Sequence, residues 1–197
     1  MTFALALIVC YLLGAVPTAY LLVKWAKGVD IRTMGSGNVG ATNALRTVGL
    51  WAGLVVLAID VLKGLIAASL IPRWLLGSTA LGVPLLCGFA AVLGHDFPCF
   101  LRFRGGKGVA TTIGVLVGSM PLVAGIVMGI WLVVFGAFRY VSLGSIAGAV
   151  AIPISQLALH QPLHEVLIGS CLAILILVRH RANVRRLLSG VEHRAWS

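Results

Sequence analysis

The chain has 197 residues, of which 60% are hydrophobic and only 10% are charged. A water-soluble domain of this length does not need so apolar a composition, so a soluble enzyme is excluded and a membrane protein is indicated. The formal net charge of +10 could indicate nucleic acid, but nearly all lysines and arginines lie between hydrophobic stretches. We therefore expect no nucleic-acid partner, and we expect the charge to orient the chain in the bilayer and to bind anions.

The apolar stretches run from end to end, which predicts a single integral membrane domain over residues 1–197. The first 23 residues lack a positive n-region, and we expect them to remain as the first membrane helix. The four scattered cysteines have no paired spacing, so neither a disulfide framework nor a zinc site is expected.

Charges between the apolar stretches test how many helices cross the membrane. The stretches are residues 3–23, 51–71, 79–93, 109–138, 143–159 and 163–178. With the N-terminus outside, the basic segments around Lys24 and Arg102 lie in the cytoplasm, as the positive-inside rule requires. Six spans would nevertheless place Arg139 and the basic C-terminal tail outside, which violates the rule.

The conflict with the positive-inside rule disappears if the stretch 109–138 is divided into two helices. This stretch is too long for one span of about 20 residues. It contains Gly118-Ser119-Met120-Pro121, and proline ends a helix. A division there predicts an all-α bundle of seven helices, with the N-terminus outside and the C-terminus cytoplasmic. Residues 109–119 would then form a helix of roughly 16 Å, too short to cross alone. We expect this short broken helix inside the bundle, with its N-terminus aimed at an anion.

Three polar segments interrupt the apolar chain and contain most of the groups able to do chemistry. The first, second and third polar segments are Gly35-Ser36-Gly37-Asn38-Val39-Gly40-Ala41-Thr42-Asn43, Arg102-Phe103-Arg104-Gly105-Gly106-Lys107-Gly108 and Arg179-His180-Arg181-Ala182-Asn183. The positive-inside rule, applied to seven helices, places all three segments on the cytoplasmic face. Glycines, hydroxyl and amide side chains and positive charge with few carboxylates are typical of a phosphate site.

The first polar segment fits G-x-G-x-x-G, but no strand precedes it, which argues against a dinucleotide fold. We expect a phosphate-binding loop in which Ser36 and Asn38 can cap a helix and glycines such as Gly37 and Gly40 let amides converge on an oxyanion. Arg46 follows closely enough to add a bidentate contact. A flexible loop with a capping serine is the alternative.

The second polar segment places Lys107 among Gly105, Gly106 and Gly108 at the start of the short helix. It lacks the upstream glycine and the following serine or threonine of a Walker A loop, so nucleotide hydrolysis is not supported. A lysine among bare amides at a helix start is a good point charge for phosphate. The alternative is that Lys107 is one more positive-inside residue.

In the third polar segment the last helix is expected to run straight out of the membrane, which puts His180 and Asn183 one turn apart on one face. Arg185 and Arg186 are expected to contact anionic headgroups. His180 is also the obvious protein candidate for a general base.

Two further pairs of ionisable residues lie outside these segments. Asp60 and Lys63, three residues apart in a membrane span, are expected to pair and to face the bundle, because an intramembrane charge is costly. His160 and Glu165 reproduce the spacing of soluble glycerolipid acyltransferases, but charge parity places them on the outer side. We expect both to be loop residues.

Carboxylates are scarce on the predicted cytoplasmic face. Asp30, Asp96 and Glu192 are widely separated in the sequence and too few for the cluster that a magnesium-dependent phosphotransferase needs. We expect no metal and no cofactor.

The motifs Ser36-Gly-Asn-Val-Gly-Ala-Thr-Asn43, Gly105-Gly-Lys-Gly-Val-Ala-Thr111 and Arg179-His-Arg-Ala-Asn183 together resemble the signatures of the bacterial membrane glycerol-3-phosphate acyltransferases that use acyl-phosphate, the PlsY family. The resemblance implies a seven-helix enzyme of the bacterial inner membrane with a cytoplasmic site. It implies transfer of a fatty acyl group from acyl-phosphate to the 1-hydroxyl of sn-glycerol 3-phosphate, which yields lysophosphatidic acid and phosphate. An upstream acyl-phosphate-forming enzyme is an implied partner.

The resemblance also implies roles for individual residues. The catalytic set is Ser36, Lys107, His180 and Asn183; the substrate-binding set is Gly37, Asn38, Gly40, Arg46, Gly105, Gly106, Gly108 and Ser142; Glu192 has a supporting role. In this family the donor's own phosphate is thought to take the hydroxyl proton, and whether it or His180 is the base stays open. The alternative function is a small carrier for phosphorylated metabolites, although the chain shows no obvious repeated halves.

Overall fold

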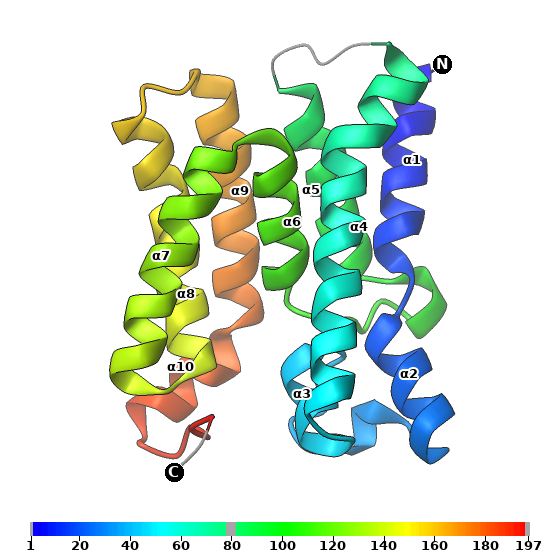
Figure 1. Ribbon diagram of the computed structural model, residues 1–197, viewed down its shortest axis with the longest axis vertical. Helices are drawn as coiled ribbons and strands as arrows, with labels where there is room; N and C mark the ends of the chain where they lie inside the picture. Colours follow the sequence, from blue (N-terminus) through cyan, green and yellow to red (C-terminus); the bar gives the residue numbers. More distant parts are fainter. Residues whose placement is uncertain (1, 78–81, 196–197) are drawn as a thin grey trace. The chain divides into compact units, whose positions relative to one another are not determined.

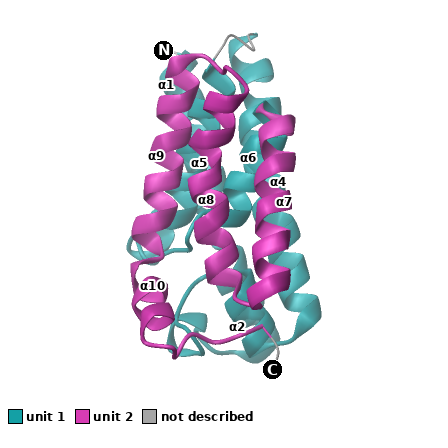
Figure 2. Ribbon diagram, turned by 90° about the vertical axis from the view of Figure 1, so that its left-hand side faces the viewer, with its two compact units in different colours: residues 1–119 teal, residues 120–197 magenta. Residues whose placement is uncertain are grey.

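The computed structural model describes residues 2–77 and 82–195, whose regular elements are helices. The chain divides into two compact units, Met1–Ser119 and Met120–Ser197, which are described separately (Figure 2). Unit 1 contains α1 (Thr2–Ala15), α2 (Thr18–Lys27), α3 (Ala41–Thr47), α4 (Leu50–Leu76), α5 (Val83–Asp96) and α6 (Val109–Ser119), with 3-10 turns at Ile31–Thr33 and Cys99–Leu101. Unit 2 contains α7 (Pro121–Phe138), α8 (Val141–Ala158), α9 (Leu163–Arg179) and α10 (Arg181–Leu188).

The described helices account for the predicted seven-helix membrane architecture. Five spans are long and apolar enough to cross a bilayer: Thr2–Lys27, Leu50–Leu76, Val83–Leu101, Pro121–Phe138 and Val141–Ala158. The bent pair α9 and α10 can form a sixth span, and α6 is a shorter apolar helix. The all-α prediction is therefore confirmed, whereas the side on which each terminus lies stays a prediction. The predicted start of the third stretch at residue 79 lies outside the described residues.

The short helix ends where the sequence predicted. α6 has 11 residues and stops at Ser119, and Pro121 occupies the first turn of α7. Between them Met120 has φ −143° and ψ 66°, which is not helical. Proline explains the break, because it disfavours helical backbone at the preceding residue while it suits the first turn of the next helix.

Glycines let α6 pack directly on α4 within unit 1 (Figure 1). A Cβ on Gly114 would lie 1.9 Å from the carbonyl oxygen of Val61, and a Cβ on Gly64 would lie 2.0 Å from that of Thr111. Small residues at such contacts are typical of membrane helices, because close backbone approach supplies dispersion contacts that burial from water cannot. The position of α6 is therefore fixed by α4.

Unit 2 is built around α8, which packs against both α7 and α9. His160 lies in the turn after α8, as expected, with φ 53°. The interpretation of Glu165 as a loop residue was wrong, since Glu165 lies in the first turn of α9. A carboxylate is favourable there because the helix N-terminus carries partial positive charge.

The close α4–α6 contact predicts a stability difference between two glycine variants. Gly114→Ala should force the helices apart and cost roughly 1–3 kcal/mol, since an added methyl has no space. Gly129→Ala is the matched control, because a Cβ on Gly129 in α7 meets nothing within 4 Å. Thermal unfolding in detergent should show a lower midpoint for Gly114→Ala only. Equal midpoints for the two variants would contradict the packing described.

Candidate active site

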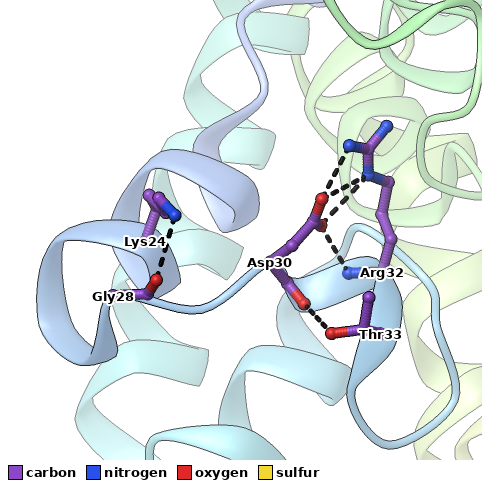
Figure 3. A network of polar contacts seen from close by, with 5 residues as sticks. All are labelled: Lys24, Gly28, Asp30, Arg32 and Thr33. Atoms are coloured by element: carbon purple, nitrogen blue, oxygen red, sulfur yellow. Dashed lines mark hydrogen bonds and ion pairs between the residues drawn. The ribbon is translucent and has the colours of Figure 1, made fainter.

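A salt-bridged turn leads into the first polar segment (Figure 3). The Asp30 carboxylate accepts from the Arg32 guanidinium at 2.7 Å and from the Arg32 backbone amide at 2.9 Å, and Thr33 Oγ1 donates to the Asp30 carbonyl. Hydrogen bonds from the Arg32 side chain lower the pKa of Asp30 below its ordinary value. The Arg32 guanidinium also lies 5.5 Å from the centre of the Tyr20 ring. Asp30 therefore has a structural partner and orders the chain before the loop.

The buried side chain of Asn43 organises the first polar segment. Its Nδ2 lies 3.2 Å from the Ile31 carbonyl and 3.0 Å from those of Met34 and Asn38, and its Oδ1 accepts from the Ser36 amide at 3.0 Å. Because Nδ2 has only two hydrogens, two of these three carbonyls share one of them. Asn43 belongs to the first polar segment, but the sequence predicted no role for it. No helix bounds were predicted around Asn43, so no signal in the sequence marked its side chain as buried.

The interpretation of Ser36 and Asn38 as helix caps was wrong. α3 begins at Ala41, and its N-cap residue is Gly40, which has no side-chain capping bond. The amides of Ser36 and Gly37 face inward, to Asn43 Oδ1 and to the Met34 carbonyl at 2.9 Å. The reason is that a buried amide side chain needs partners, and this loop supplies them. The Ser36 and Arg46 side chains are exposed.

The second polar segment is a tight turn attached to the end of α5. The Gly105 amide donates to the Asp96 carbonyl at 3.2 Å, and the Gly106 amide donates to the His95 carbonyl at 3.0 Å. A Cβ on Gly106 would lie 2.0 Å from His95 Nε2, so only glycine fits. Gly108 has φ 73° and precedes the first residue of α6. The turn thus places half-buried Lys107 two residues before α6.

Unit 1 brings the first and second polar segments to one small cavity. Val39 and Gly105 both line it, together with Thr18, Asp60 and His95.

The expected pairing inside the membrane span is confirmed, since Lys63 Nζ lies 2.8 Å from Asp60 Oδ1 and both side chains are 4% exposed. Within residues 2–77 and 82–195, no group of three or more His, Cys, Asp or Glu side chains is placed to hold a metal ion.

The third polar segment contains a bend, so the expected straight exit of the last helix was wrong. The axes of α9 and α10 differ by 56°, and His180 is the residue between them. The Ile176 carbonyl lies 3.0 Å from the His180 amide nitrogen and 2.8 Å from its ring Nδ1. The ring and the backbone amide of His180 thus share one carbonyl at the point where the helix bends. Because a carbonyl only accepts, Nδ1 carries a hydrogen, and a neutral His180 has its lone pair on Nε2.

The Glu192 carboxylate accepts hydrogen bonds from three side chains near the start of α8 in unit 2. Its Oε1 accepts from Ser142 Oγ at 3.0 Å and Asn183 Nδ2 at 2.7 Å, and its Oε2 accepts from Arg186 Nε at 2.6 Å. Arg186 is thus engaged by a carboxylate, while Arg185 is exposed. Burial would raise the pKa of Glu192, but these donors outweigh it and leave the pKa below its ordinary value. Glu192 orients two predicted site residues, Ser142 and Asn183, toward one carboxylate.

The segment after α10 is fixed to the α7–α8 turn within unit 2. The Ala195 amide donates to the Arg139 carbonyl at 2.9 Å, and the Arg194 guanidinium lies 5.4 Å from the centre of the Tyr140 ring. Together with Glu192, these contacts hold the C-terminal segment against the N-terminus of α8. A carboxylate at that position is stabilised by the helix dipole.

These features define a polytopic helical membrane protein, and comparison with known proteins agrees. A family model described as glycerol-3-phosphate acyltransferase matches residues 4–190. Glycerol-3-phosphate acyltransferase 2 of Moorella thermoacetica is 48% identical over 193 residues, which cover 96% of each chain. The Rippkaea orientalis enzyme is 44% identical over 95% of this chain and 90% of its own.

Two solved structures of PlsY (YgiH), an integral membrane glycerol 3-phosphate acyltransferase, are also similar. The glycerol 3-phosphate form has a TM-score of 0.91 and 40% identity over 98% of this chain and 96% of its own. The lysophosphatidic acid form has a TM-score of 0.87 and 39% identity over 98% and 95%. The chain belongs to the glycerol-3-phosphate acyltransferase family. It is an integral membrane enzyme of phospholipid biosynthesis, and the family resemblance drawn from the motifs is confirmed.

The bonding of Glu192 predicts a pH-dependent stability. Because its folded-state pKa is lowered, ionised Glu192 stabilises the fold above its ordinary pKa, and this contribution is lost as the pH falls through the lowered value. At pH 7, Glu192→Gln should lower stability by roughly 1–3 kcal/mol, since it removes the charge from three hydrogen bonds. Thermal midpoints in detergent should therefore separate the variant from wild type at pH 7 and converge in acid.

Glu165→Gln is the matched control for that experiment, because Glu165 lies in the same unit but outside this network. It should lose only the helix-dipole contribution, about 0.3–1 kcal/mol, so its midpoint at pH 7 should lie closer to wild type than that of Glu192→Gln. A difference between Glu192→Gln and wild type that persists unchanged in acid would show that the carboxylate charge is not the cause.

Proposed function

We propose that the acyl donor is acyl-phosphate and that the acceptor is the 1-hydroxyl of sn-glycerol 3-phosphate. The observation that carries this proposal is the Gly105–Gly108 turn, which places Lys107 just before the N-terminus of a half-length membrane helix. Lysine charge and the positive end of a helix dipole both favour a phosphate. Membership in the glycerol-3-phosphate acyltransferase family supports the acceptor, and the motif resemblance supports the donor.

Within unit 1, we assign Lys107 to the phosphate and to the developing negative charge of the transition state. The exposed Ser36 and Arg46 side chains supply a hydroxyl and a guanidinium for substrate. The remaining substrate-binding residues act mainly through backbone shape. These residues are Gly37, Asn38 and Gly40 in the first loop and Gly105, Gly106 and Gly108 in the second. The inward amides of Gly37, Gly105 and Gly106 favour this shaping role over direct contact.

Within unit 2, we assign His180 and Asn183 to catalysis and Ser142 to substrate binding. Glu192 supports two of them, because it accepts hydrogen bonds from Asn183 and Ser142. The Nδ1 hydrogen of His180 is directed to the Ile176 carbonyl, so Nε2 is the nitrogen that can accept a hydrogen bond or a proton.

The proposed reaction needs little covalent chemistry from the protein. The acceptor hydroxyl oxygen attacks the acyl carbonyl carbon, and the resulting tetrahedral oxyanion collapses with cleavage of the bond to the phosphate oxygen. The departing phosphate takes the hydroxyl proton, so the products are lysophosphatidic acid and hydrogen phosphate. His180 Nε2 is the alternative acceptor for that proton. Because the donor is an activated anhydride, proximity and fixed positive charge provide the acceleration, with no metal or cofactor.

We place the enzyme in the bacterial inner membrane with its site on the cytoplasmic face. The positive-inside distribution of lysine and arginine supports this orientation. An upstream reaction that forms acyl-phosphate must supply the donor, which enters from the bilayer because of its fatty chain.

The donor assignment is tested with purified wild-type enzyme in detergent. With chelator present, acyl-phosphate and glycerol 3-phosphate should give lysophosphatidic acid and phosphate in equal amounts, measured by mass spectrometry and phosphate release. Acyl-coenzyme A with the same chain should give no product, since it cannot release phosphate from the reacting bond. Product from acyl-coenzyme A but not from acyl-phosphate would refute the proposed donor while leaving the family assignment intact.

A further inference from the structure

Three buried ionisable side chains form a connected set beneath the second polar segment in unit 1. Lys63 Nζ lies 2.8 Å from Asp60 Oδ1 and 2.8 Å from His95 Nδ1, so it bridges α4 to α5. The side chains of Asp60, Lys63 and His95 are only 4%, 4% and 8% exposed. Ionised groups inside a membrane protein are expensive, and a buried ion pair is often no more stabilising than apolar residues of the same volume. Stability alone is therefore a poor reason for this arrangement.

The bridge fixes the tautomer of His95. A lysine ammonium can only donate, so His95 Nδ1 accepts from Lys63 and the ring hydrogen lies on Nε2. Lys63 Nζ also lies 3.4 Å from the carbonyl of Val16, at the break between α1 and α2. The imidazole is therefore held by a cation that is itself held from two sides, by Asp60 and by Val16.

The His95 ring supports the glycine turn directly. Nε2 occupies the position that a side chain on residue 106 would need, since a Cβ there would lie 2.0 Å away. The His95 backbone carbonyl meanwhile accepts the Gly106 amide at 3.0 Å. One residue thus contacts Gly106 through both its ring and its backbone, and the next residue is Lys107. A shift of the ring toward Gly106 would therefore displace the turn.

We propose that Lys63 and His95 are positioning residues that hold the Gly105–Gly108 turn, and with it Lys107, in the geometry needed to bind the phosphate. Lys63 acts through His95, and its ion pair with Asp60 holds Lys63 in place. This inference rests on the proposed role of the turn. It gives the buried charges a function in substrate binding and turnover.

The first test uses a charge-neutral change and a histidine change, each assayed for lysophosphatidic acid formation. Asp60→Asn/Lys63→Met removes both charges without leaving either one unpaired, and His95→Asn shortens the side chain so that it no longer reaches the turn. Each should lower kcat/KM for glycerol 3-phosphate or acyl-phosphate by roughly 10- to 100-fold, as expected for a misplacement near 1 Å. Ser69→Ala on α4, whose hydroxyl donates to the Leu65 carbonyl of its own helix, is the control with wild-type kinetics.

The second test combines the changes and separates positioning from general destabilisation. If Lys63 acts through His95, the triple variant should be no worse in kcat/KM than His95→Asn alone, whereas independent effects would multiply. His95→Gln, whose amide can still place a donor near the turn, should retain more activity than His95→Asn. This ranking is measured with all charges at positions 60 and 63 present, so it remains readable even if the neutral pair fails to fold.

Three results would overturn the inference. They are folded variants with wild-type kcat and KM, multiplicative losses in the triple variant, and equal activity of the asparagine and glutamine variants at position 95. Absence of lysophosphatidic acid formation by the wild-type enzyme would instead refute the proposed function itself.

Discussion

The attachment of the Gly105–Gly106 turn to the end of α5 is the constraint on which the rest of the candidate site depends. Two backbone carbonyls accept the turn's amides, and no side chain fits at residue 106 because the His95 ring lies beneath it. The turn then leads into α6, whose position is fixed by glycine contacts with α4. Lys107 is therefore placed by backbone packing rather than by its own flexible side chain.

Local rules predicted most membrane spans, but they missed the break at Val16 and Pro17 that divides the first predicted helix into α1 and α2. The positive-inside rule required a division of the longest apolar stretch. Pro121 marked the position, because proline restricts the backbone of its immediate neighbours. α6 consequently has the predicted bounds. The same reasoning failed at His180, where the bend accompanies a bond from the imidazole to the Ile176 carbonyl. That bond depends on a rotamer and on burial, which the apolar pattern does not encode.

The motifs identified the segments of the site but not the direction of their polar groups. Exposed glycine amides were expected to converge on an anion, yet those of Gly37, Gly105 and Gly106 donate to the protein's own carbonyls. The carbonyls that accept them belong to residues 34, 96 and 95, whose geometry only the folded chain defines. Asn43 and Glu192 each form hydrogen bonds with several partners, and these partners too are brought together only by folding. Membership in the acyltransferase family explains the activity, while these contacts explain how the chain shapes its loops.

The most direct test of this account is the activity of Lys107→Ala with acyl-phosphate and glycerol 3-phosphate, measured beside Lys24→Ala. Lys24 is an exposed cation in the same unit that bonds the Gly28 carbonyl, so it controls for the loss of one positive charge. We expect Lys107→Ala to lose about 100-fold or more in kcat with its thermal midpoint unchanged, since a preorganised charge at the reacting phosphate is removed. Lys24→Ala should match wild type. Wild-type turnover in folded Lys107→Ala would contradict the account.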